Sequence, residues 1–468
     1  MLTGPLLYAT LRVPVTIILS RMERQPLLFK NNKVVLGLVL VFFALAQILT
    51  TFLLVRALSN IHWYWTGPRL DLTDFSQFYQ AGQLIISPNS HHIYDPDVQE
   101  NWCLGLIYPQ IPVKGLFYNQ SVPFLYVFCI PYGLLPYNIS YVVWCLSTGL
   151  MSIVALWLLL QKSLQGLNGR KIFAFTFLCL AYASIPAYLT VWHGQTTFLL
   201  VCAMSLCLYF YLCGKDVLAG IALALSTVKP QYILLPLATM AGLAKWRLVI
   251  ALFVAEASLF ALAACFMGVE NIIGYPKILV NAESSTRFCG VNPHVMASLR
   301  GLLSVLMVHK TAMLITCLSL FASLIPTALW AKSIKASGNF LVRERFILAF
   351  TYTLALVLSP HSHYFDCLLL TVPAALTMRG LLISKENGAE QNEIEAWRPV
   401  QSNPWYHLWC RLLFFYPLLS WIYNFCLGSM EAEGIAFLIT NVVLTCSLAG
   451  IIKSTGPIKS VEKSLETT

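Results

Sequence analysis

The chain has 468 residues, of which 58% are hydrophobic and only 11% are charged, and its mean hydropathy is +0.71. Because soluble domains carry about 25% charged residues, this composition excludes a water-soluble globular enzyme. The net charge is +10, from 30 basic and 20 acidic residues. Most of the basic residues lie in short loops between apolar segments and act as topology signals, so the charge gives no reason to expect a nucleic-acid partner.

Apolar segments long enough to cross a bilayer recur through nearly the whole sequence. They predict an all-α polytopic membrane protein, one bundle of about 11–13 transmembrane helices. The first span runs from about residue 34 to residue 55. Four basic residues precede it: Arg21, Arg24, Lys30 and Lys33. The positive-inside rule therefore places residues 1–33 in the cytoplasm and the large first loop, 57–121, outside.

Basic loops continue this alternation along the rest of the chain. The predicted inner residues are Lys162, Arg170, Lys171, Lys215, Lys245, Arg247, Lys332, Lys335, Arg343 and Arg345. The spans between them are 172–190, 196–213, 246–268, 311–331, 346–360 and 363–378. A polar cytoplasmic linker, 379–406, a helix pair, 407–452, and a cytoplasmic tail, 453–468, complete the chain.

Two segments do not fit a simple count of spans. Residues 122–161 are apolar enough for two crossings, but the flanking charges require an odd number, so 122–135 is predicted to be re-entrant. Segment 217–244 is interrupted by Lys229-Pro230 and forms either two short half-spans or one kinked helix. Because non-helical backbone at membrane depth lines a cavity or is buried in protein, both breaks mark candidate site walls.

The first outer loop contains the sequence LDLTDFSQFYQAGQLI, which ends at Ile85. It predicts a short amphipathic helix that Thr73 or Asp74 caps, with Phe75, Phe78 and Tyr79 directed toward the bilayer surface. An alternative interpretation is that Asp74 is only a helix cap.

Other polar residues fall at predicted outer ends of spans. They are His193, Gln195, Lys229, Arg300, His361 and His363. A lysine at a proline break between apolar segments needs a partner or a polar cavity, unless its side chain snorkels to the interface. His361 and His363 either hydrogen-bond the phosphate or help to orient the acceptor, or they are merely interfacial. His193 and Gln195 flank Gly194, which permits a close backbone approach, or they simply end two helices.

The order of the motifs is informative. A D-F-x-x-F-Y-x-A-G helix is followed by Ile93-Tyr94-Asp95-Pro96, Phe117-Tyr118, His193-Gly194-Gln195, Lys229-Pro230 and an amphipathic segment from Asn292 to Leu303. Over residues 34–378 this arrangement resembles glycosyltransferase family 87. The resemblance implies a GT-C-like catalytic module and the use of polyprenyl-phosphate-linked sugars, typically mannose. The chain departs from the family at 117–123, where the family usually has a Tyr-Pro-Pro run.

The resemblance also implies roles for the site residues. Asp74 matches the family's catalytic acid position and is expected to be the general base of an inverting transfer, with Asp71 and Asp95 as rivals. The residues expected to bind the donor phosphate or the substrate are Lys229, His361, His363, His193, Gln195, Arg300 and Tyr118. The residues expected to support them are Tyr79, Asp95 and Asp366, the last by orienting the His363 imidazole. The sequence has no zinc-type spacing, and no metal or cofactor is expected.

Nucleotide sugars are absent outside the cytoplasm, so an outward-facing transferase needs a donor that crosses the bilayer as a lipid. The sequence has neither a dinucleotide-binding fingerprint nor a P-loop. The expected partners are a polyprenyl-phosphate sugar, a lipid or glycan acceptor and membrane lipids. The family's usual distribution favours a bacterial plasma membrane, with the endoplasmic reticulum as the alternative.

Two other functions compete with an enzyme. A transporter or lipid flippase would also have broken helices and intramembrane charges, but it would more often show internal repeats. A scaffold subunit would tolerate loss of Asp74.

Overall fold

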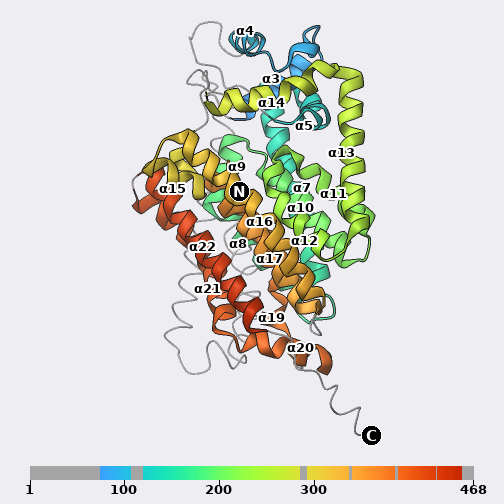
Figure 1. The fold of residues 1–468 in the computed structure, drawn as a ribbon, viewed down its shortest axis with the longest axis vertical. Coiled ribbons are helices and arrows are strands. Elements are labelled where there is room, and N and C mark those ends of the chain that lie inside the picture. The colour runs from blue at the N-terminus through green and yellow to red at the C-terminus, as the bar shows by residue number, and fades with distance from the viewer. Residues whose placement is uncertain are drawn as a thin grey trace, which may run out of the picture.

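A computed structural model describes residues 74–106, 120–284, 292–336, 340–384, 388–427 and 429–455. Apart from a single β-bridge between Met296 and His363, the secondary structure of these residues is helical (Figure 1). The predicted first span, 34–55, and Tyr118 lie outside the described residues.

The first described helices form one end of the molecule, at the top of Figure 1. They are α3 (Phe75–Ile85), η1 (Ser90–His92) and α4 (Pro96–Leu106). The prediction that the aromatic face of α3 is directed toward the bilayer surface is wrong. Phe75 and Phe78 are buried and pack against Trp144, with ring centroids 5.8 and 5.4 Å away. Trp144 gives these rings an apolar environment inside the protein, which serves an apolar helix face as well as lipid does.

Helix α3 crosses the next short segment at two glycines. That segment is α5 (Val122–Phe124), the π-helix η2 (Leu125–Cys129) and α6 (Ile130–Gly133). A Cβ on Gly82 would lie 2.2 Å from the carbonyl oxygen of Cys129, and a Cβ on Gly133 would lie 2.4 Å from the carbonyl carbon of Gly82. The two backbones therefore touch at these glycines, which sets how closely α3 packs against the segment 122–133.

Helix α7 (Tyr137–Ser163) is the single long helix of the segment 122–161 and packs against α10 (Thr197–Leu212). The preceding apolar segment, Val122–Gly133, is too short to cross a bilayer. This arrangement agrees with the odd number of crossings that the flanking charges require.

The predicted span 172–190 is broken. Helices α8 (Arg170–Tyr182) and α9 (Ile185–His193) meet at an angle of 59°. Pro186 lies in the first turn of α9, where its missing N–H does no harm, but its ring prevents the helix from continuing backwards.

The segment 217–244 adopts the first of its two predicted forms, two short helices. They are α11 (Asp216–Ala224), which ends in η3 (Leu225–Val228), and α12 (Leu234–Gly242), which follows η4 (Pro230–Tyr232). Lys229 lies between them with an extended backbone, φ −138° and ψ 78°. The residue before a proline avoids helical dihedrals, so the break falls where the sequence places it.

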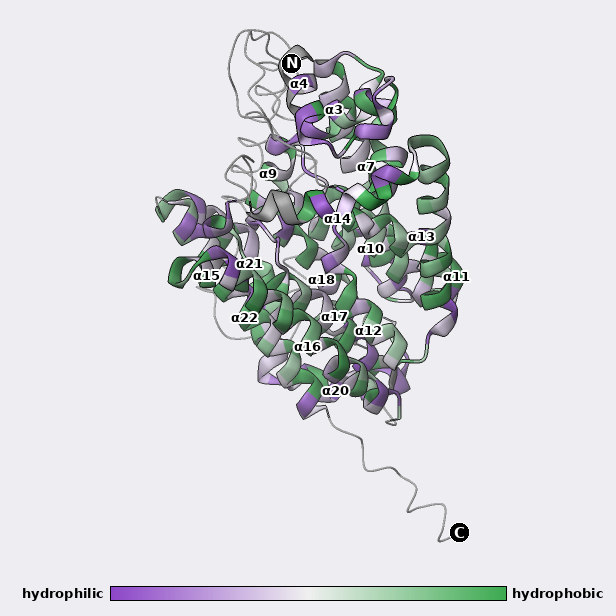
Figure 2. Cartoon of the chain, turned by 45° about the horizontal axis from the view of Figure 1, so that its top comes forward, coloured by the Kyte–Doolittle hydropathy of each residue, from purple (hydrophilic) through white to green (hydrophobic). Residues whose placement is uncertain are grey.

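The middle of the chain contains two long helices with exposed apolar side chains. The elements are α13 (Trp246–Met267), α14 (Val269–Ser284), η5 (Pro293–Val295), α15 (Leu299–Leu306) and α16 (His309–Lys335). Large apolar side chains such as Phe253 on α13 and Ile325 on α16 are exposed, and both helices are largely hydrophobic in Figure 2. Helix α15 buries its polar residues, Arg300 and Ser304, against the protein and exposes Leu306, as a helix lying along a membrane surface would.

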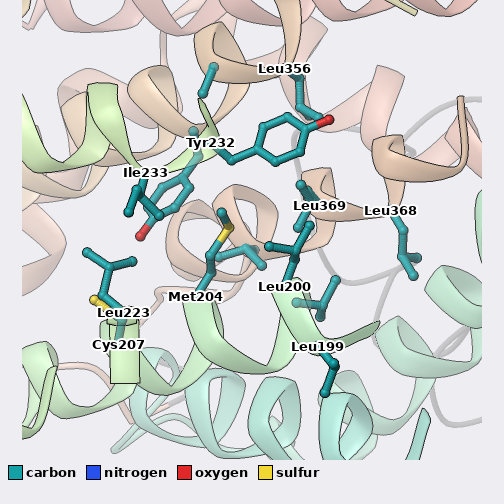
Figure 3. Close-up of a cluster of buried hydrophobic side chains, with 14 of the residues drawn as sticks. Leu199, Leu200, Met204, Cys207, Leu223, Tyr232, Ile233, Leu356, Leu368 and Leu369 are labelled. Carbon is teal, nitrogen blue, oxygen red and sulfur yellow. The ribbon is translucent and has the colours of Figure 1, made fainter. Parts of the chain in front are cut away.

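The remaining helices complete the bundle. They are α17 (Phe340–Leu358), η6 (Tyr364–Leu370), α18 (Thr371–Thr377), α19 (Arg379–Leu382), α20 (Gln391–Gln401), α21 (Pro404–Cys426) and α22 (Met430–Ser454). Figure 3 shows part of the core, in which Leu200 and Met204 of α10, Tyr232 of η4 and Leu369 of η6 come together.

Four helices of the described chain are long and apolar enough to cross a membrane, or five if α8 and α9 form one bent span. The protein is therefore an all-α polytopic membrane protein, as its composition predicts.

Candidate functional site

Asp74 lies one residue before α3, but its side chain does not cap the helix. Instead, Gln195 Nε2 donates a hydrogen bond of 2.5 Å to Asp74 Oδ2, and Gln77 Nε2 lies 3.5 Å from Oδ1. The side chain is 28% exposed. The interpretation of Asp74 as only a cap is wrong, because its oxygens face a distant loop and solvent rather than the N–H groups of its own helix.

His193 is the second neighbour of this carboxylate. Its Nδ1 lies 3.9 Å from Asp74 Oδ2, and its side chain is 33% exposed. Gly194 ends α9 in the left-handed region, with φ +63°, and Trp144 Nε1 donates to its carbonyl at 2.9 Å. This tight turn directs the flanking His193 and Gln195 at the same aspartate, which two residues of a continuing helix would not do.

Asp366 is fully buried and is the most heavily hydrogen-bonded carboxylate of the site. Its donors are Lys229 Nζ at 2.7 and 2.9 Å, Thr197 Oγ1 at 2.8 Å, Tyr232 OH at 2.9 Å and the backbone N–H of His363 at 3.2 Å. Lys229 thus has the partner that its position requires, and it does not snorkel. The expected bond between Asp366 and the His363 ring is replaced by one to the His363 backbone.

The Phe365 ring lies between the residues around Asp74 and those around Asp366. Its centroid lies 5.2 Å from that of His363, 6.0 Å from that of His193 and 5.1 Å from Lys229 Nζ. The last contact is a cation–π interaction. The surroundings of Asp74 and those of Asp366 are therefore continuous.

Three residues from other parts of the chain hold the loop 359–363 by donating hydrogen bonds to its backbone carbonyls. Arg300 Nη1 donates to the Pro360 carbonyl at 2.8 Å, Gln231 Nε2 donates to the His361 carbonyl at 3.1 Å, and the Ala297 N–H donates to the Ser362 carbonyl at 2.8 Å. The rings of His361 and His363 meet edge to face at 5.0 Å. Elements far apart in the sequence thus fix both imidazoles.

The result is one partly exposed carboxylate beside a group of cations and imidazoles. His361, Lys229, His193 and Arg300 all lie within electrostatic range of the His363 imidazole. Such a group can stabilise an anion such as a phosphate, while the carboxylate can accept a proton from a hydroxyl group.

A scan of protein families matches the description Glycosyltransferase family 87 to residues 122–360, which is more than half of the chain. The chain belongs to glycosyltransferase family 87. It is accordingly a membrane glycosyltransferase. The match includes His193, Gln195, Lys229 and Arg300, whereas Asp74 precedes it and His361 and His363 follow it. No curated protein and no solved structure matches the chain.

Two expected supporting residues of this family 87 protein have structural contacts. Tyr79 OH donates to the Leu135 carbonyl at 3.1 Å and so ties α3 to the turn before α7. Asp95 Oδ1 accepts the Asp97 N–H at 2.9 Å and caps α4. Asp71 lies outside the described residues.

Sequence reasoning missed three residues of this glycosyltransferase: Thr197, Tyr232 and Phe365. Each lies within two residues of a motif that the sequence does show, namely Gln195, Pro230 and Asp366. Adjacency was the available signal, but hydroxyl and aromatic side chains beside apolar segments are too common to single out. Among the described residues no group of three or more histidine, cysteine or acidic side chains could hold a metal ion.

Gly194→Ala is expected to damage both stability and activity. A Cβ at this position would lie 2.5 Å from Phe75 Cβ, and the left-handed backbone adds strain, so we expect a loss of about 2–5 kcal/mol in unfolding free energy. The control is Gly214→Ala, also left-handed at φ +71° but with nothing within 4 Å, for which about 1 kcal/mol is expected. Equal losses in denaturation experiments would contradict the importance of this close approach.

Proposed function

We propose that this protein transfers a hexose, mannose, from a polyprenyl-phosphate donor to a hydroxyl group of a lipid or glycan acceptor on the extracytoplasmic face. The transfer inverts the configuration at the anomeric carbon, with Asp74 as the general base. One observation carries the proposal: a partly exposed aspartate, held by Gln195, lies beside a group of imidazoles and cations from four other parts of the chain. Family membership supports glycosyl transfer and does not favour the transporter alternative.

The two oxygens of Asp74 have different tasks in this scheme. Oδ2 accepts the 2.5 Å hydrogen bond from Gln195, whereas the distance from Gln77 to Oδ1 is at the limit of a hydrogen bond. Oδ1 therefore takes the proton of the acceptor hydroxyl. The hydroxyl oxygen bonds to the anomeric carbon, the bond from that carbon to the phosphate oxygen breaks, and polyprenyl phosphate leaves with the electron pair.

The leaving phosphate gains negative charge, and cations nearby stabilise it. We assign this task to the Arg300 guanidinium, with the His361 and His363 rings as N–H donors beside it. Burial, together with the neighbouring cations, holds the pKa of His363 well below its ordinary value, so this ring donates as a neutral imidazole. The charge of Lys229 is balanced by Asp366, so Lys229 supports the site mainly by anchoring η6. The polyprenyl chain would lie along apolar helix surfaces at the bilayer.

The donor assay tests the proposal. The purified protein in lipid vesicles is given radiolabelled polyprenyl-phosphate mannose or nucleotide-linked mannose, together with extracted native lipids from a bacterial plasma membrane or from endoplasmic reticulum. We expect labelled product from the lipid-linked donor alone, with an α-linkage if the donor is β-linked. Transfer from the nucleotide sugar, or retention of configuration, would overturn the proposal.

A further inference from the structure

A polar cavity lies at the opposite end of the molecule from Asp74. Its volume is about 430 Å³, and its lining includes Lys162, Gln165, Arg345, Arg379, Glu390 and Glu393. Helices α19 and α20, next to this cavity in the sequence, lie at the bottom of Figure 1, whereas α3 lies at the top.

The length of helix α7 gives the distance between the cavity and the site around Asp74. Its first residue, Tyr137, packs on Phe75 with ring centroids 5.6 Å apart, and its last residue, Ser163, contacts the arginines of the cavity. Twenty-seven residues at about 1.5 Å each span roughly 40 Å. The cavity is therefore not part of the site around Asp74.

The two arginines are held in place by oxygen atoms of Ser163 and Gln165. Arg345 Nη1 donates to Ser163 Oγ at 2.9 Å, and Arg379 Nη1 donates to the carbonyls of Ser163 and Gln165 at 3.0 and 2.9 Å. These carbonyls belong to the last residue of α7 and to the turn that follows it, where the helix dipole favours cations. The guanidinium groups are thus fixed next to each other before any ligand binds.

The cavity has more positive than negative charge. Arg379 Nε pairs with Glu393 at 2.5 Å, but in the described parts of the chain no carboxylate lies within 4.0 Å of the Arg345 guanidinium. Lys162 Nζ donates to the neutral amide of Gln165 at 2.8 Å. Among the lining residues that the structure describes, three cations therefore face two carboxylates. Glu393 and Glu344 lie within electrostatic range of Arg345, but neither forms an ion pair with it. Two adjacent guanidinium groups beside a lysine match the planar donors and charge that bind phosphate groups.

We propose that this cavity binds a phosphate group, presented by the headgroup of an anionic phospholipid or by a small soluble phosphate. Its lining residues belong to the loops that the positive-inside rule assigns to the cytoplasm, at the level of the inner leaflet, where basic pockets between membrane helices bind anionic headgroups. The volume is large enough for such a headgroup. This proposal does not depend on the transfer reaction.

The test uses the full-length protein in phosphatidylcholine nanodiscs and measures the midpoint of thermal unfolding. One arm replaces part of the lipid with phosphatidylglycerol, and the other adds inorganic phosphate. A ligand that binds the folded state alone raises the midpoint, so at least one arm is expected to do so. The arm that responds identifies the source of the phosphate.

Three variants locate the effect. Arg345→Gln removes the guanidinium that forms no ion pair within the described part of the chain and is expected to weaken binding about tenfold. Lys162→Gln removes a cation that holds no main-chain oxygen and is expected to weaken binding several-fold. Lys453→Gln is the control, since Lys453 is an exposed cation at the end of α22 and should leave the response unchanged.

Three results would overturn the proposal that the cavity binds phosphate. A midpoint that neither arm raises overturns the proposal, and so does an equal response of all three variants, which would indicate diffuse electrostatic attraction. If Arg345→Gln does not fold, Lys162→Gln decides: a full wild-type response in that variant also overturns the proposal.

Discussion

Asp74→Asn is expected to lower the rate of glycosyl transfer about a thousandfold while leaving donor binding intact. Asparagine has the same shape and can still present an oxygen to Gln195, so the loop 193–195 stays in place. It cannot accept a proton from the acceptor hydroxyl. The measurement is product formation from radiolabelled polyprenyl-phosphate mannose, together with donor binding to the purified variant.

Asp95→Asn is the matched control for this experiment. Asp95 is an exposed acid of the same region whose side chain caps α4, so its loss is expected to cost about 1 kcal/mol of stability and little activity. Full activity of Asp74→Asn, or equal losses from the two variants, would remove Asp74 from the mechanism. Labelling of a cysteine at position 74 from the cytoplasmic side would contradict the proposed location of the site.

Asp366→Asn is expected to destabilise the protein by about 3–5 kcal/mol, because it leaves the Lys229 ammonium in a largely buried position without its counter-charge. Activity should fall as well, since the same carboxylate holds Thr197, Tyr232 and the backbone of His363. Unfolding of the purified variants in denaturant gives the stability change.

A double-mutant cycle distinguishes the ion pair from a general loss of packing. Lys229→Met combined with Asp366→Asn removes both charges and retains an amide oxygen for the remaining donors. We expect the double variant to recover stability relative to Asp366→Asn, with a coupling energy of about 1–3 kcal/mol. Additive losses would show that the pair does not stabilise the fold.

The sequence predicted the ends and breaks of elements better than their environments. The break at Lys229-Pro230 and the single crossing after residue 135 were predictable, because proline restricts its neighbours and basic loops restrict topology. The burial of Phe75 and Phe78 was not. Their spacing shows that they share a helix face, but the spacing does not distinguish a protein surface from a lipid surface, since both are apolar.

The site residues show the same division. The sequence indicated that Lys229 needs a partner, but the partner, Asp366, lies 137 positions away. Asp366 was expected to hold an imidazole one turn away, and instead it joins its own element, η6, to Lys229, η4 and α10. Local spacing defines only contacts within a turn or two, whereas a buried carboxylate satisfies its oxygens with any donor that the fold brings near.

By itself, the sequence determined that this protein is a helical membrane protein of glycosyltransferase family 87, with Asp74, His193 and Lys229 among its candidate residues. Hydropathy, charge and proline are properties of short segments, so they can be recognised without knowing the fold. Only the tertiary structure decided that Gln195 holds Asp74, that Asp366 neutralises Lys229 and that Phe365 lies between the two. Those contacts depend on the packing of helices distant in sequence, and a single amino-acid sequence is not enough to derive which helix faces pack together.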